Sequence, residues 1–160
     1  MTTQQLINLI NLEADELLDT DKDNIPYVNQ AIDFLSFFLA GMNDPDMFIT
    51  TDVADGDNIP ASFIDFIPKN GYPIAVNGSK FKIISDDYMI RDVHMTLSKP
   101  HVAAMDDNIP FRDSYAGCLV LIASYLIKKK TYIPVEYCEQ DKSFITELMG
   151  AIKAAKGGAA

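Results

Sequence analysis

One polar loop carries the residues best suited to binding a metal ion. Asp19, Asp21 and Asp23 alternate with other residues, and calcium-binding EF-hand loops begin with acidic residues at positions 1, 3 and 5. The match then fails, because Asn24 stands where the turn needs glycine and Gln30 where the bidentate glutamate belongs. We therefore expect no bound metal and a helix-connecting loop with capping carboxylates, with a calcium-binding interaction module as an alternative.

The cysteines and histidines do not form a structural zinc pattern. His94 and His101 are seven residues apart, and Cys118 and Cys138 are twenty apart. Two cysteines are also too few for a disulfide scaffold, so both are expected to be reduced. A hydrolase using Cys138 and either histidine has no surrounding motif, and the chain contains no phosphate-binding loop or nucleophile elbow. We predict a protein that is not an enzyme and uses no cofactor.

Acidic residues dominate the charge of the chain. It has 23 Asp and Glu against 13 Lys and Arg, which gives a net charge of −10. Such a surface repels nucleic acid and anionic membranes, so the protein should allow DNA to pass close by without binding it tightly. The first residues lack the positive region of a secretory signal, which predicts a protein that stays in the cytoplasm. The length of 160 residues fits one domain.

The elements that would position any site are organised around a long apolar helix predicted at residues 110–130. Nearly every residue from 116 to 127 is apolar, but this run is only about half of the roughly 20 residues that a membrane span requires. Pro110 suits a first helical turn, and the lysines at 128–130 suit a helix C-terminus. A helix that is apolar almost all round must be covered by the rest of the chain or by other copies.

Three further helices are predicted, at residues 3–18, 26–41 and 139–156. The first begins with capping-box spacing, with Thr2 as the cap and Gln5 three residues on. In the second, Phe34 and Phe37 widen the apolar stripe beyond what one neighbour covers, which suggests an intersubunit contact. The fold class is therefore α+β: mainly a bundle of about four helices, with an antiparallel β region inserted between the second and third.

The β region is predicted at residues 47–97, where β-branched and aromatic residues alternate between turn residues. Asn77 and Gly78 predict a hairpin with a type I′ turn. Met89 is expected to share one face of a later strand with Val93 and Met95. The sequence does not separate core from interface for four residues of this region: Ile64, Phe66, Tyr72 and Tyr88.

The tetrapeptide Asp-Asn-Ile-Pro occurs three times, beginning at Asp23, Asp57 and Asp107. Its spacings of 34 and 50 residues are unequal, which argues against a repeat architecture. We interpret it as a local signal, used more than once, that marks the start of a helix or leads into a strand.

The order of these signals resembles that of the head-tail adaptor (connector) proteins of tailed bacteriophages. Two N-terminal helices precede Ile-Pro-Ala-Ser-Phe at 59–63, a strand pair that turns on Asn77 and Gly78, and Asp-Asp-Asn-Ile-Pro at 106–110 before the longest apolar helix. The resemblance covers most of the chain, from about residue 3 to residue 156. Its motifs are short, and the segment from 97 to 106 departs from the pattern because it lacks a clear aromatic residue before Pro100.

The resemblance implies a ring of usually twelve copies that docks under the portal protein, binds a downstream neck or tail protein and lines the channel through which double-stranded DNA leaves. The protein would be made in the host cytoplasm and located in the neck of the virion, with no membrane contact. Another phage neck or tail-completion protein is the alternative within this class. The candidate residues are Phe34, Phe37 and Phe38 for intersubunit contact, Phe144, Leu148, Lys153 and Lys156 for portal contact, and Asp55, Asp57, Asn77 and Gly78 for the tail-side loops.

Overall fold

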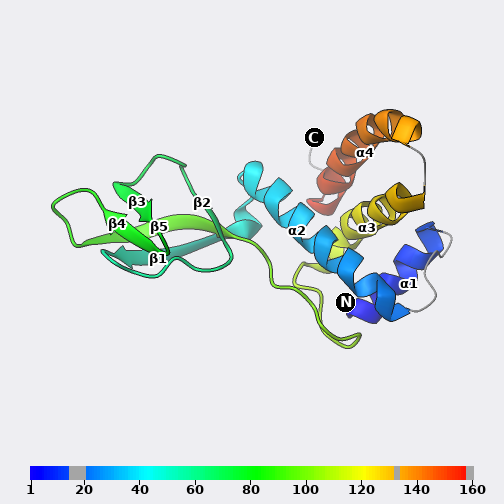
Figure 1. Cartoon of the computed structure of the whole chain (residues 1–160), viewed down its shortest axis with the longest axis horizontal. Helices are drawn as coiled ribbons and strands as arrows, with labels where there is room; N and C mark the ends of the chain where they lie inside the picture. Colours follow the sequence, from blue (N-terminus) through cyan, green and yellow to red (C-terminus); the bar gives the residue numbers. More distant parts are fainter. Residues whose placement is uncertain (15–20, 132–133, 158–160) are drawn as a thin grey trace. The chain divides into compact units, whose positions relative to one another are not determined.

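The computed structural model describes the backbone of residues 1–14, 21–131 and 134–157, and the side chains of residues 1–14, 23–129 and 143–157. The chain divides into two compact units, Met1–Leu35 with Pro100–Ala160 and Ser36–Lys99. We call them the helical unit and the β unit. Four helices, with antiparallel strands between the second and the third, confirm the predicted α+β class (Figure 1).

The helices are α1 (Thr3–Ala14), α2 (Ile25–Gly41), α3 (Ala116–Thr131) and α4 (Pro134–Ala155), and the division into units falls within α2. The capping box at the start of α1 is confirmed. The Thr2 hydroxyl accepts the N–H of Gln5 at 3.3 Å, and the Gln5 side-chain oxygen accepts the N–H of Thr2 at 2.9 Å. Residues 15–18 of the predicted first helix lie outside the described residues.

The central helix α3 starts later than predicted. Residues 110–112 are not helical, and a short 3₁₀ helix, Asp113–Tyr115, precedes Ala116. Pro110 fails to open the helix because the segment before it is held in an extended pairing, described below. The helix α4 starts earlier than predicted, at Pro134, a residue that favours a first helical turn.

The core of the helical unit forms along α3. Its fully buried residues recur at spacings of three and four, and this stripe packs against α1 and α4. No described helix is both long enough and apolar enough to cross a membrane. The buried residues of α3 are Cys118, Leu119, Ile122, Ala123, Ser124 and Ile127.

The β unit contains a three-stranded antiparallel sheet and a separate hairpin. The sheet has the order β1 (Phe48–Ala54), β5 (Met89–Leu97), β2 (Phe63–Phe66), and the hairpin pairs β3 (Ile74–Asn77) with β4 (Lys80–Ile83). Aromatic rings join the two, with the centroids of Phe63 and Phe81 5.3 Å apart. The buried cluster of this unit is Val53, Phe66, Phe81, Val93 and Met95.

The hairpin forms as predicted, but its turn is shifted by one residue. Asn77 pairs with Lys80, so the two turn residues are Gly78 and Ser79. Gly78 has φ +63°, whereas Asn77 and Ser79 do not have positive φ. Positive φ at the first central residue alone is the type II′ pattern, which favours glycine there, so the type I′ prediction is wrong.

A bulge in β5 overturns the predicted face of that strand. The pairing register with β1 shifts between Thr51 and Val53, and Asp92 adopts φ +53°. An extra residue in a strand reverses which side chains point inward beyond it. Ile90 therefore packs on the core cluster, and the prediction that Met89 shares the face of Val93 is wrong.

Two Asp-Asn-Ile-Pro copies belong to a longer repeated unit, Ala-x-x-Asp-Asn-Ile-Pro, at residues 54–60 and 104–110. In each, the N–H of the aspartate donates to the carbonyl oxygen of that alanine, at 3.1 and 3.2 Å. The aspartate carboxylate also accepts the alanine N–H, at 2.8 and 2.9 Å. The same residue types therefore form the same hydrogen-bonded turn at both positions.

Each of these turns also captures a short extended segment. In the β unit, the carbonyl oxygen of Asp57 accepts the N–H of Phe81 at 2.8 Å, and the N–H of Ile59 donates to Ser79 at 2.9 Å. The two equivalent bonds join the second turn to residues 1–3, at 2.8 and 3.0 Å. The motif therefore does more than mark the start of an element, because its backbone pairs with a segment that is distant in the sequence through an isolated antiparallel β-bridge.

Protonating Asp107 is expected to destabilise the helical unit. The N–H groups of Ala103 and Ala104 hold the pKa of its carboxyl below the usual value near 3.8. Because the folded-state pKa is the lower one, the stabilisation is complete above the usual value and is lost as the pH falls through the folded-state pKa. In Asp107→Asn, the melting temperature followed by circular dichroism should therefore fall less steeply below about pH 4.

Asp106→Asn is the matched control for this prediction, since Asp106 is exposed and, among the described residues, its carboxylate accepts no backbone N–H. Its pH profile should follow that of the unaltered protein. A profile for Asp107→Asn as steep as that of the unaltered protein would contradict the role given to this carboxylate.

Candidate functional site

The β unit has a hollow of about 460 Å³ beside an exposed aromatic residue. The end of α2 supplies Phe37, Ala40 and Gly41 to its lining, and residues 64–69 supply the opposite wall. Phe37 is 57% exposed. Burying such a ring is favourable, and the wall beside it is apolar except for Asp65 and Lys69, so this hollow is a candidate contact surface.

The three predicted interface phenylalanines do not share one environment. Phe34 is half-buried in the helical unit and meets Phe144 edge to face, with centroids 5.7 Å apart. Phe38 is also half-buried, whereas Phe37 is exposed. The extra width of the α2 stripe is therefore partly core packing, and Phe37 presents most of the remaining apolar surface.

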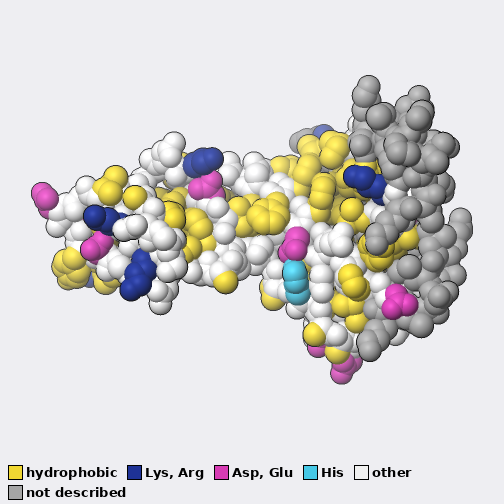
Figure 2. Space-filling model, in the orientation of Figure 1, with side chains coloured by type: hydrophobic (Ala, Val, Ile, Leu, Met, Phe, Trp, Pro, Cys, Tyr) yellow, Lys and Arg dark blue, Asp and Glu magenta, His cyan; other side chains and the backbone are white. Residues whose placement is uncertain are grey.

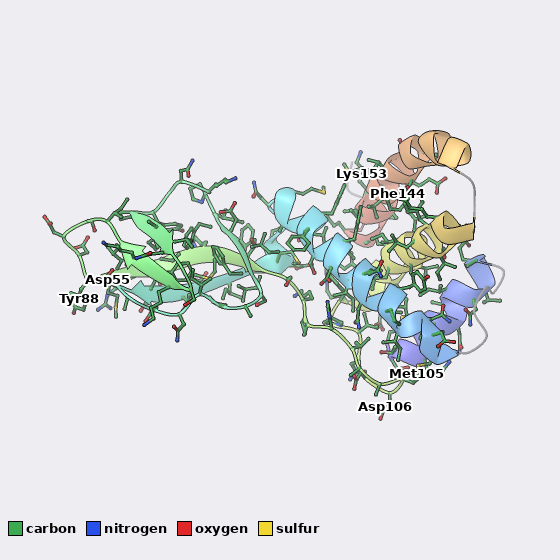
Figure 3. The ribbon with its side chains drawn as sticks, viewed as in Figure 1. Asp55, Tyr88, Met105, Asp106, Phe144 and Lys153 are labelled. Carbon is green, nitrogen blue, oxygen red and sulfur yellow. The ribbon has the colours of Figure 1, made fainter. Side chains whose placement is uncertain are left out.

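The predicted portal-contact residues of α4 also divide into two groups. Phe144 and Leu148 are buried, and the ring of Tyr125 stacks on Phe144 at 4.1 Å between centroids. Lys153 and Lys156 have exposed side chains (Figure 3 labels Phe144 and Lys153). Phe144 and Leu148 are therefore packed within this chain, whereas the two lysines lie on the surface.

The acidic loop of the β unit is built into its backbone hydrogen bonding. The Asp55 carboxylate accepts the N–H of Ile83 at 2.8 Å, and the Asp57 carboxylate accepts that of Ala54 at 2.8 Å. Asp55 and Tyr88 lie together at one end of this unit in Figure 3, where the Asp55 N–H donates to the Tyr88 carbonyl oxygen at 2.8 Å. These carboxylates are exposed but have a structural role. Asn77 and Gly78, at the hairpin tip, are exposed.

Among the described residues, no group of three or more His, Cys, Asp or Glu side chains is arranged to hold a metal ion. Asp23 is exposed, and the side chains of Asp19 and Asp21 lie outside the described set. The His94 ring contacts the Thr50 hydroxyl at 2.8 Å, and the His101 ring contacts the Asp33 carboxylate at 2.8 Å.

The described cysteine has the properties of a core residue. Burial raises the pKa of the Cys118 thiol to about 11, so at neutral pH it is protonated and a poor nucleophile. Cys138 lies within α4, before residue 139 where that helix was predicted to begin, and its side chain is outside the described set.

Comparison of the sequence with models of known protein families finds no match, and comparison with curated proteins finds none either.

The far wall of the hollow is the part that sequence reasoning missed. Ile64 and Phe66 line this wall. The sequence did not reveal this, because alternation along a short strand does not distinguish a core side chain from one that borders a surface hollow. Tyr88 is exposed and Tyr72 is half-buried, donating its hydroxyl to the Ile67 carbonyl oxygen at 3.0 Å. Figure 2 shows apolar and charged side chains interspersed on the visible face of the β unit.

Proposed function

We propose that this chain is a structural subunit of a phage head-tail adaptor, a ring that docks under the portal and surrounds the path of the DNA. One observation carries the proposal: the exposed Phe37 lies beside a 460 Å³ hollow of the β unit, whose wall at residues 64–69 is apolar except for Asp65 and Lys69. A ring subunit needs such a surface, because each copy must bury apolar area against its neighbours.

The charge of the chain supports the same role. At −10 per copy, a ring would present an acidic channel, and like charge would keep DNA from binding to it during ejection. The order of two helices, a β insertion and two further helices also agrees with the organisation that the resemblance implies.

The proposal is tested by mass measurement. The full chain is examined by light scattering after size exclusion, alone and mixed with the portal ring of the same phage. We expect either a preformed ring or a monomer that joins the portal at one fixed stoichiometry. A chain that stays monomeric and does not bind the portal would contradict the adaptor role. A chain that binds only a tail protein would assign it to another part of the neck.

A further inference from the structure

A second hollow of the β unit, of about 360 Å³, lies along the edge strand β1. We call it the β1 hollow, and we call the one beside Phe37 the Phe37 hollow. The floor of the β1 hollow consists of core residues that are at most 2% exposed: Val53, Phe81 and Met95. Ile49, which is 40% exposed, adds further apolar surface. A cavity of about 150 Å³ is enough to hold a benzene ring, so the β1 hollow has room for one phenylalanine side chain.

The two hollows lie on opposite sides of the same three-stranded sheet. β1, which lines the β1 hollow, and β2, which lines the Phe37 hollow, are its two edge strands. Met95 of β5 lines the first hollow, and the next residue, Thr96, lines the second. Successive side chains of a strand point to opposite faces, so the hollows also differ in face. Each copy therefore presents two different surfaces, as a head-to-tail contact requires.

The polar part of the β1 hollow is acidic. Its lining contains Asp52 and Asp57 and no basic residue. Each carboxylate accepts one backbone N–H, from Asp92 at 3.0 Å and from Ala54 at 2.8 Å, and neither forms an ion pair with a side chain that the structure describes. A carboxylate has two acceptor oxygens, so both groups keep the capacity to bind a cation beside an inserted ring.

The Phe37 hollow carries a cation that can meet this charge. The side chain of Lys69 is 78% exposed, and its ammonium lies 3.8 Å from the Asp65 carboxylate. An exposed pair of this kind contributes little to stability, so the ammonium can turn to another carboxylate at small cost. Two β1 hollows facing each other would instead bring four carboxylates together, which disfavours a two-fold contact through this surface.

We propose that Phe37 of one copy inserts into the β1 hollow of the next copy, with Lys69 beside Asp52 and Asp57. The inserted ring would be buried against Val53, Phe81 and Met95, and the same contact repeated from copy to copy closes a ring. This inference rests on the proposed ring and names the surface that receives Phe37.

The first test maps the contact by photocrosslinking, under the conditions in which the mass measurement shows assembly. p-Benzoylphenylalanine takes the place of Phe37 in the full chain, and ¹⁵N-labelled and unlabelled chains are mixed before irradiation. We expect peptides of mixed isotope content that join position 37 to residues 49–60 of another copy. Cross-links between copies that reach only residues 37–43 or 64–69 would show a two-fold contact and overturn the proposal. Cross-links to the portal alone, or none, would also overturn it.

The second test fills the β1 hollow. Thr51 is exposed and lines it, so Thr51→Trp should occupy the space that the ring needs and weaken self-association or portal binding at least about thirtyfold. Thr50→Trp is the matched control, because Thr50 is exposed on the opposite face of the same strand and does not line the hollow. Sedimentation velocity measures both variants, after circular dichroism has shown that they are folded. Normal assembly of Thr51→Trp, or an equal loss in Thr50→Trp, would contradict the proposal, and the cross-links decide if Thr51→Trp does not fold.

These outcomes separate the contact from the function on which it rests. A chain that assembles neither alone nor on the portal would contradict both. A chain that assembles with Phe37 cross-linked elsewhere would overturn only the head-to-tail contact and leave the adaptor role standing.

Discussion

Replacing Leu119 by alanine is expected to lower the free energy of unfolding by about 2–5 kcal/mol. Leu119 is 1% exposed and lies on the stripe of α3 that packs against α1 and α4. The loss combines the transfer free energy of the removed methyl groups with the cavity left among neighbours that relax only partly. A single domain is typically stable by about 5–15 kcal/mol, so this one change would remove a large share of the total.

The measurement is urea unfolding followed by far-ultraviolet circular dichroism, which reports mainly on the helices. Leu12→Ala is the matched control, because Leu12 lies in α1 of the same unit and is 78% exposed. That change should stay within about 0.5 kcal/mol. Equal losses in the two variants would contradict the core assigned to α3. Leu119→Asp should prevent folding of the unit altogether, because it buries an unpaired carboxylate.

Replacing Phe37 by aspartate is expected to leave the fold intact and to block assembly. The ring is exposed in the chain by itself, so its removal costs the folded chain little. At an interface, an aromatic residue at the centre of an apolar contact commonly contributes about 2 kcal/mol or more, and a charge placed there must be desolvated. We expect at least about thirtyfold weaker self-association or portal binding, measured by sedimentation velocity.

Tyr88→Asp is the control for this variant. Tyr88 is an exposed aromatic residue of the same β unit and does not line the hollow. It should assemble as the unaltered chain does, and circular dichroism should show that both variants are folded. If Phe37→Asp assembles normally, the hollow is not the contact surface. If Phe37→Asp unfolds, Phe37→Ser provides the same comparison without introducing a charge.

Local chemistry explains the features that were predicted correctly. The capping box of Thr2 and Gln5 forms because its donors and acceptors lie within one helical turn. The helices α1 and α2 follow the spacing of their apolar residues, and the β region begins and ends within a residue of its expected limits. Gly78 places a hairpin near the expected position because glycine tolerates positive φ.

Contacts between distant segments explain the errors. Alternation along β5 fails at Asp92, where the Asp52 carboxylate of β1 accepts its N–H at 3.0 Å within the bulge. Pro110 would suit a helix start, but the turn before it is paired with residues 1–3, so α3 begins at Ala116. Neither outcome follows from a window of neighbouring residues, because the deciding partner is far away in the sequence.

The candidate sites show the same division. Composition and patterning predicted an acidic chain with more apolar surface on its second helix than one neighbour covers, but periodicity alone does not show which ring is left exposed. Packing against Phe144 makes Phe34 part of the core, and Phe37 remains on the surface.

By itself, the sequence determined the class of the fold, the number of helices, the β insertion and the charge, because these depend on local propensity, periodicity and composition. The tertiary structure alone decided where α3 starts, how β5 is bulged and which apolar side chains remain uncovered. It also gave the repeated Asp-Asn-Ile-Pro turn its role. The physical reason is that a backbone group or a side chain finds its final partner only when segments distant in the chain are brought together, and that pairing overrides the local preference.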